Sequence, residues 1–356
     1  MAAPATKGRG ARTNASGRYE AQTTEAFDDG WTAEDSEPPP LRTTLSSERA
    51  RTIITRNTSP DIGFDRSINP YRGCEHGCIY CYARPAHAYM GLSPGLDFES
   101  RLFFKPEAAR LLEQELAHPR YRCKRIHIGG NTDPYQPVER EQRITRGVLE
   151  VLQRFNHPFS IITKSVLIAR DADILGPMGK DGLASAFVSI TTLDRGLARA
   201  MEPRASTPAK RLEAISRLAD AGCPVGVGFA PVIPGLNDHE LEAVLEAAAK
   251  AGATCAMYVT LRLPLEIKDL FQEWLADARP DRAARVMSLV RQTRGGRDYD
   301  PDWSQRMTGR GPVADLIAAR FKTAAKRYGL DGPRHQLDES RFRVPADMRK
   351  QLELFG

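Results

Sequence analysis

The sequence is poor in cysteine and has no long hydrophobic run. Only six of its 356 residues are cysteine, and three of these stand alone at Cys123, Cys223 and Cys255. No segment approaches the roughly 18 consecutive apolar residues that a membrane-spanning helix requires. The first residues, MAAPATKGRGARTNASG, lack the apolar core of a signal peptide. We therefore expect a cytoplasmic protein without a membrane partner, whose isolated cysteines are small buried hydrophobic residues.

Charge is unevenly distributed along the chain. The net charge is +6, and residues 281–356 alone carry 16 Lys and Arg against 10 Asp and Glu. Such a basic region suits a polyanionic partner such as nucleic acid, or equally an arginine-rich surface facing solvent. Residues 1–50 carry 6 Lys and Arg against 8 Asp and Glu, and few large apolar side chains. This composition buries too little surface to offset chain entropy, so we predict a disordered N-terminal tail over 1–50.

Short, β-branched apolar runs alternate with helical patterns in the middle of the chain. Runs of this kind are typical of strands buried on both faces of a parallel sheet. Five such strands are expected at 125–130, 159–164, 186–191, 225–232 and 256–261, and a sixth within 66–71. Their spacing of roughly 30 residues is that of repeated βαβ units. The sequence thus predicts an α/β fold, a partial (β/α)6 barrel over 51–265 with its active face at the carboxyl ends of the strands.

The C-terminal part has a different pattern. Residues 266–356 are basic and mainly helical in pattern, with an amphipathic helix expected near 312–329. The preceding loop mixes arginine with aromatic residues and glycine. Such a segment suits stacking on unpaired bases, but a lid over the open barrel would have the same composition.

The other three cysteines lie together in CEHGCIYC, at residues 74–81. In a reducing cytoplasm, cysteines this close together more often bind metal than form disulfides. Gly73 and Gly77 allow a tight loop in which Cys74, Cys78 and Cys81 face one point. The spacing C-x3-C-x2-C therefore predicts a metal site.

Two kinds of metal site are compatible with three cysteines. A structural zinc would need a fourth Cys or His, and neither His76 nor His87 has a familiar zinc-ligand spacing. A [4Fe–4S] cluster held by three cysteines leaves one iron open for another ligand. Spacing alone favours the cluster but leaves zinc open.

The cysteine loop also resembles the signature of a known superfamily. C-x3-C-x2-C with an aromatic residue before the last cysteine, here Tyr80, is similar to the motif of radical S-adenosylmethionine (radical SAM) enzymes. In that superfamily the amino and carboxylate groups of SAM chelate the open iron. The segment IHIGGNTDPYQPVE at 126–139 resembles the superfamily's Gly-Gly motif at the end of the second strand, with Gly129 and Gly130 at that place. The resemblance implies a radical SAM barrel with a [4Fe–4S] cluster and SAM as cofactors.

The resemblance is strongest to the spore photoproduct lyase-like, or DNA-repair-photolyase-like, branch. It covers about residues 69–238, through NPYRGCEHGCIYCYAR, GGNTDPYQPVE, ITKS, SITTLD, MEPRA and PVIPGLND. By this resemblance the glycine backbone meets the SAM amine, and Lys164 pairs with the SAM carboxylate. The other expected SAM contacts are Tyr80 and Tyr82 near the adenine, Asn131, Thr132 and Asp133 at the ribose or amine, and Ser189 on the fourth strand. Glu202 and Arg204 are expected as a charge pair that lines the barrel mouth or clasps a helix, and Arg204 is also expected to contact SAM.

One position departs from the branch. In spore photoproduct lyase, a cysteine just before the Thr/Ser-Asp stretch of the second strand donates hydrogen to the product radical. Asn131 is the nearest match here, and Cys123 lies at the other end of that strand. Tyr82, Tyr135 and Tyr258 are alternative donors, although core aromatic residues are commoner than radical relays. Dimer repair in spores is therefore not the expected reaction.

The resemblance implies a mechanism more firmly than a substrate. A reduced cluster would cleave SAM to methionine and a 5′-deoxyadenosyl radical, which abstracts hydrogen from the substrate. A flavodoxin- or ferredoxin-type reductant is the expected partner, with nucleic acid a candidate substrate and the chain a monomer. A radical SAM enzyme acting on a peptide or small molecule, and a non-catalytic metal- and nucleic-acid-binding protein, are the alternatives.

Overall fold

The computed structural model describes residues 8–20, 41–332 and 335–348. Its main sheet has seven strands in the order β10-β9-β8-β7-β6-β3-β2. Neighbouring strands from β3 to β10 are parallel, and β2 pairs with β3 in antiparallel fashion at one edge. The strands are β2 (Ile54–Arg56), β3 (Arg66–Ile68), β6 (Ile126–Ile128), β7 (Phe159–Thr163), β8 (Ala184–Ser189), β9 (Val225–Val232) and β10 (Cys255–Thr260). The predicted six parallel strands of a partial barrel are confirmed.

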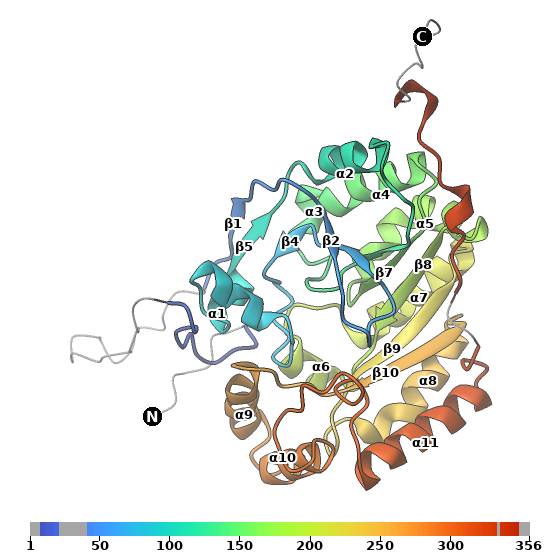
Figure 1. The fold of residues 1–356 in the computed structure, drawn as a ribbon. Coiled ribbons are helices and arrows are strands. Elements are labelled where there is room, and N and C mark those ends of the chain that lie inside the picture. The colour runs from blue at the N-terminus through green and yellow to red at the C-terminus, as the bar shows by residue number, and fades with distance from the viewer. Residues whose placement is uncertain (1–7, 21–40, 333–334, 349–356) are drawn as a thin grey trace, which may run out of the picture.

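Helices cover the outer face of this sheet (Figure 1). Five of them, α2, α4, α5, α7 and α8, bury one apolar stripe each, as α4 does with Val148, Leu149 and Leu152. These stripes join the buried strand residues in one core. The helices are α2 (Ala108–Ala117), α3 (Glu139–Gln142), α4 (Ile144–Arg154), α5 (Ala172–Lys180), α6 (Arg195–Met201), α7 (Pro208–Ala221) and α8 (Leu241–Lys250). Each connection returns the chain to the same edge, so the carboxyl ends of the parallel strands gather at one end of the barrel.

The C-terminal part is helical, as predicted. It contains α9 (Ile267–Ala278), α10 (Ala283–Gln292) and α11 (Pro312–Arg327). The last helix runs beside α8 (Figure 1), where the Arg320 guanidinium pairs with the Glu242 carboxylate at 2.6 Å. Phe321 packs on the Tyr258 ring of β10, with 4.7 Å between ring centroids. Among the described residues, no helix is both long and apolar enough to span a membrane.

The prediction of a disordered tail over 1–50 is wrong for residues 8–20 and 41–50. Residues 44–47 form β1 (Thr44–Ser47), in a second sheet of order β1-β5-β4 with β5 (Arg101–Phe104) and β4 (Tyr71–Arg72). Residues 8–20 lie beside α1 (Leu96–Ser100), where Arg9 is 3 % exposed. The prediction of disorder was based on the low content of large apolar residues. It is wrong here because polar contacts with distant residues, rather than apolar burial, hold this segment in place. Residues 1–7 and 21–40 of the predicted tail lie outside the described residues.

Candidate active site

The cysteine loop follows β4 and turns tightly. Cys74 and Cys78 are 6 % and 7 % exposed, and Cys81 is half-buried. Gly73 and Gly77 have φ angles of +72° and +67°, a backbone region that favours glycine. A Cβ at Gly77 would lie 2.6 Å from the Glu99 Oε2 atom, so the loop has no room for a side chain there. The predicted role of these glycines in curling the loop is confirmed.

The three cysteines line one cavity of about 600 Å³, which extends from the carboxyl ends of the strands along the barrel interior to residues near the strand beginnings, such as Arg125 and Ser185. Most of the residues expected around SAM line the same cavity. These are Tyr80, Tyr82, Gly129, Gly130, Asn131, Thr132, Asp133, Lys164 and Ser189. The fold therefore brings together residues that are up to 115 positions apart, from Cys74 to Ser189.

Neither nearby histidine completes a tetrahedral zinc site. The His76 Nδ1 atom lies 3.3 Å from the Asp133 carboxylate. The His87 ring contacts the Arg101 carbonyl through Nε2 at 3.0 Å, and burial lowers the pKa of His87 to about 4. Within the described part of the chain, no three His, Cys, Asp or Glu side chains are arranged around a single metal ion. Three thiols on one cavity without a fourth protein ligand fit a [4Fe–4S] cluster with one open iron.

Asp133 is held rigidly beside this loop. Its carboxylate accepts hydrogen bonds from the Thr163 hydroxyl at 2.6 Å and the Lys164 backbone N–H at 2.8 Å. Burial alone would raise the pKa of Asp133, but the charge of His76 and these hydrogen bonds lower it to about 2. Asp133 is therefore an anion that joins the end of β6 to the end of β7.

Lys164 is a buried cation at the end of β7. Its Nζ atom lies 5.8 Å from the centroid of the Tyr80 ring. Burial alone would lower the pKa of Lys164, but Cys78 and Glu202 raise it above the ordinary value. The cavity thus contains an ammonium group within reach of the cysteine loop.

Glu202 and Arg204 do not form the expected charge pair. The Glu202 carboxylate pairs with Arg211 and accepts hydrogen bonds from the hydroxyls of Tyr80 and Thr191. Burial opposes ionisation, but Arg211 and Lys164 lower the pKa of Glu202 to about 2. Arg204 pairs with Glu75 instead and is not among the cavity-lining residues. The two residues point to different partners because Glu202 turns into the core while Arg204 is 38 % exposed.

The expected charge pair is therefore replaced by two supports of the cysteine loop. Glu202 holds Tyr80, which lies between Cys78 and Cys81. The Arg204 side chain pairs with Glu75, which directly follows Cys74. The backbone N–H of Arg204 donates to the His76 carbonyl at 3.3 Å. The expectation that Arg204 contacts SAM is not supported by its position outside the cavity.

Sequence reasoning missed several residues that close the cavity. The Arg262 guanidinium lies 4.8 Å from the Tyr82 ring centroid, and the Tyr82 hydroxyl donates to the Gly130 carbonyl. Arg306 and Asp61 form a two-point ion pair at 2.5 and 2.6 Å. Asp61 lies in the segment after β2, which is one edge strand of the sheet. Arg306 lies next to Met307, whose carbonyl accepts a hydrogen bond from Thr260 at the end of the other edge strand, β10. The ion pair therefore bridges the open side of the barrel. The arginine-rich pattern of 291–330 was the only signal for such a closure.

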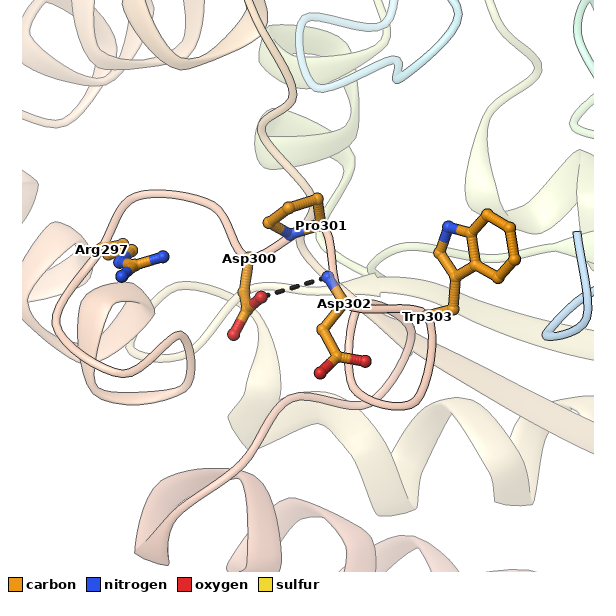
Figure 2. Close-up of a pocket in the computed structure, with 5 residues that line it drawn as sticks. All are labelled: Arg297, Asp300, Pro301, Asp302 and Trp303. Atoms are coloured by element: carbon orange, nitrogen blue, oxygen red, sulfur yellow. Dashed lines mark hydrogen bonds between the residues drawn. The ribbon is translucent and has the colours of Figure 1, made fainter.

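A second hollow lies on the loop between α10 and α11 (Figure 2). Its lining residues are Arg297, Asp300, Pro301, Asp302 and Trp303. The Asp302 backbone N–H donates to the Asp300 carboxylate at 3.1 Å, and the Trp303 indole points away from Arg297. This lining contains no cysteine and no residue at a strand end. The cavity at the cysteine loop is therefore the candidate active site.

Two kinds of comparison agree with this geometry. The radical SAM superfamily model matches residues 68–248. An uncharacterized protein of Mycobacterium tuberculosis is 35% identical over 257 residues, which cover 72% of this chain and 74% of that protein. A second uncharacterized protein, from Methanocaldococcus jannaschii, is 27% identical over 173 residues, covering 49% of this chain and 62% of the relative.

Solved structures show the same fold at low identity. A spore photoproduct lyase variant has a TM-score of 0.54 at 14% identity, and the match covers 80% of this chain and 79% of that one. A second variant of that enzyme gives a TM-score of 0.51 at 16% identity, over 80% of this chain and 78% of the other. At such identity the likeness concerns the fold alone. The superfamily model, which matches half of the chain, shows that the chain belongs to the radical SAM superfamily, and the fold and the three cysteines agree with it.

Proposed function

We propose that this protein is a radical SAM enzyme whose Cys74, Cys78 and Cys81 bind three irons of a [4Fe–4S] cluster. The observation that carries the proposal is the convergence of these cysteines and nine expected SAM-contact residues on one cavity. When bound and reduced, the cluster supplies one electron that cleaves SAM to methionine and a 5′-deoxyadenosyl radical. A one-electron donor of the flavodoxin or ferredoxin type would serve as reductant.

The protein's own residues would orient SAM and exclude water. Lys164 and Arg262 both bring a cation to the cavity, and neither forms an ion pair with a carboxylate of the described residues. The Lys164 ammonium is the one assigned to the SAM carboxylate, because it lies beside the cysteine loop, 5.8 Å from the Tyr80 ring centroid. Tyr80 and Tyr82 offer ring surfaces for the adenine. Asp133 ties the segment after β6 to the end of β7, and Gly129 and the residues after it would contact SAM there.

The substrate class that the cavity lining favours is a nucleotide or nucleic acid. Arg125 and Arg262 bring positive charge to the cavity, and Tyr82 and Tyr258 bring aromatic faces. Aromatic stacking and cationic groups are the usual means of binding unpaired bases and phosphates. Asn131 lines the cavity and is the nearest match in sequence to the hydrogen-donating cysteine of spore photoproduct lyase, so the reaction would not follow that enzyme's quenching step. Tyr82 and Tyr258 line the cavity as candidate donors, whereas Tyr135 is buried against Asp171 outside it.

A non-catalytic binding protein is the second candidate, and one experiment separates it from an enzyme. The protein is reconstituted anaerobically with iron and sulfide, reduced in the presence of SAM, and assayed for 5′-deoxyadenosine by mass spectrometry. Formation of 5′-deoxyadenosine that depends on iron and sulfide supports the enzyme. About four irons per chain without SAM cleavage and without SAM binding supports the binder, and zinc in place of iron contradicts the proposal.

Replacing Lys164 with alanine tests the assignment of the SAM carboxylate. We expect the dissociation constant for SAM to rise about 30-fold, because removing one partner of a buried charge pair costs about 2 kcal/mol or more. Lys180→Ala is the matched control, since Lys180 is exposed at the end of α5. Isothermal titration under anaerobic conditions measures both, at equal iron content. An unchanged affinity in Lys164→Ala would place the carboxylate elsewhere.

A further inference from the structure

The N-terminal segment 8–15, called the strap here, packs directly on the cysteine loop. A Cβ at Gly10 would lie 1.9 Å from the Gly77 carbonyl oxygen, so the two backbones are in contact. Ala11 is fully buried and belongs to the same apolar cluster as Cys78 and Ile79. No strap residue is among those that line the cavity. The strap therefore covers the loop on a side away from the cavity, next to α1 (Figure 1).

A buried carboxylate joins the strap to the loop. Glu99 is 0 % exposed, and its two oxygens accept hydrogen bonds from the backbone N–H groups of Gly10 and Ala11, both at 2.8 Å. The same carboxylate pairs with the Arg84 guanidinium. A side chain at Gly10 would have to displace this whole arrangement.

Arg84 joins Glu99 to the backbone of the cysteine loop. It is 0 % exposed and donates to the carbonyl groups of Gly77 at 3.0 Å and Cys78 at 2.9 Å. It also donates to the carbonyls of Pro94 and Gly95, at 3.0 and 2.9 Å. The backbone on either side of the Cys78 ligand is thus fixed through Arg84 and Glu99 to the strap.

Arg9 adds a second cation at this place. Its guanidinium donates to the carbonyls of Glu99 at 2.6 Å and Leu41 at 2.8 Å, and to the Thr43 hydroxyl at 3.0 Å. Around the loop, the positive charges of Arg9, Arg84 and Arg204 face the negative charges of Glu99 and Glu75, which leaves one positive charge in excess. A net positive charge beside the ligand loop would stabilise the more negative, reduced form of a cluster.

The far end of the strap is tied to α9. The Thr13 hydroxyl donates to Glu273 at 2.9 Å, and Arg12 pairs with Asp277 at 2.8 Å. The Thr13 carbonyl also accepts from the Leu96 backbone N–H at 3.3 Å. These contacts hold the strap across the loop between α1 and the C-terminal helices.

We propose that the strap is a positioning element for the cluster, which closes the cysteine loop against water and oxygen and raises the reduction potential through Arg9. The inference rests on the proposed function, since it concerns the same cluster. Residues 8–15 would hold the cysteine ligands in their geometry, and they would not contact SAM or substrate.

Gly10→Ala and Arg9→Met test the strap in the reconstituted full-length protein. Gly147→Ala is the matched control for the first, because its Cβ meets only Ala109 Cβ at 3.4 Å. The rate at which the cluster absorbance disappears in air is measured for each variant, together with iron content and the thermal unfolding of the apo-protein. We expect Gly10→Ala to lose its cluster about tenfold faster than wild type, the lower end of the effect of outer-shell changes on metal sites. Gly147→Ala should match wild type.

Arg9→Met separates the electrostatic role from folding. Arg9→Met loses three hydrogen bonds, so its apo-protein should unfold at a somewhat lower temperature. At equal iron content and below that temperature, its midpoint potential should be more negative than that of wild type. Equal rates of cluster loss in Gly10→Ala and wild type would show that the strap does not protect the cluster. An unchanged midpoint potential in Arg9→Met would show that Arg9 does not raise the potential. A wild-type protein that binds no cluster would overturn the proposed function itself, so the two failures are distinguishable.

Discussion

Replacing Cys78 with alanine is expected to abolish the formation of 5′-deoxyadenosine by the reconstituted protein. Each of the three cysteines would bind a different iron, and none of the neighbouring histidines is free to replace a lost thiolate. Loss of one ligand would therefore remove the cluster that is proposed to donate the electron to SAM. The measurement is 5′-deoxyadenosine by mass spectrometry, with iron and sulfide determined for the same sample.

The matched control for this change is Cys223→Ala. Cys223 is also buried, and burial raises the pKa of its thiol to about 12, as it does for Cys78 in the absence of metal. It packs in the main core and does not line the cavity. Cys223→Ala should keep its cluster and its product, whereas full activity in Cys78→Ala would show that the loop does not hold the cluster.

Replacing Glu202 with glutamine is expected to destabilise the fold by about 3 kcal/mol, because breaking a buried ion pair leaves an uncompensated charge. Glu202 and Arg211 are 2 % and 1 % exposed, and no second carboxylate of the described residues pairs with Arg211. The glutamine would also weaken the support of Tyr80 between two cluster ligands. Chemical denaturation of the reduced apo-protein at neutral pH measures the change.

The same pair makes a prediction for pH. The folded pKa of Glu202 lies at about 2, below its ordinary 4.5, so its contribution to stability is present above pH 4.5 and lost as pH falls toward 2. Glu202→Gln should flatten this part of the stability curve. Glu213→Gln is the control, because the Glu213 side chain is 40 % exposed and pairs with Lys210 and Arg217 on its own helix. If both variants were as stable as wild type, the Glu202–Arg211 pair would not be the support that the structure indicates.

The sequence predicted the barrel and the position of most site residues for a physical reason. Strands such as β9 are buried on both faces, so their apolar runs are visible without any knowledge of their partners. Lys164 comes directly after β7, and Asp133 comes five residues after β6. Because parallel strands end at one edge, their meeting in one cavity follows from the chain order.

The sequence could not predict contacts that depend on distant polar partners. The strap was taken as disorder because the carboxylate that holds it, Glu99, lies 89 residues from Gly10. The pair Asp61–Arg306 joins residues 245 positions apart, and no local pattern marks either one. Glu202 and Arg204 were expected to pair because they are close in sequence, but the backbone turns their side chains to opposite environments. Charge pairs of this kind are set by the tertiary fold.

The most direct test of the account is the electron paramagnetic resonance spectrum of the reduced, reconstituted protein during titration with SAM. The account predicts the signal of a reduced [4Fe–4S] cluster that changes on SAM binding, because SAM would occupy the open iron. The signal should be absent from Cys78→Ala and present in Cys223→Ala. A cluster signal that SAM leaves unchanged, or a protein that holds zinc and gives no signal, would contradict the central claim.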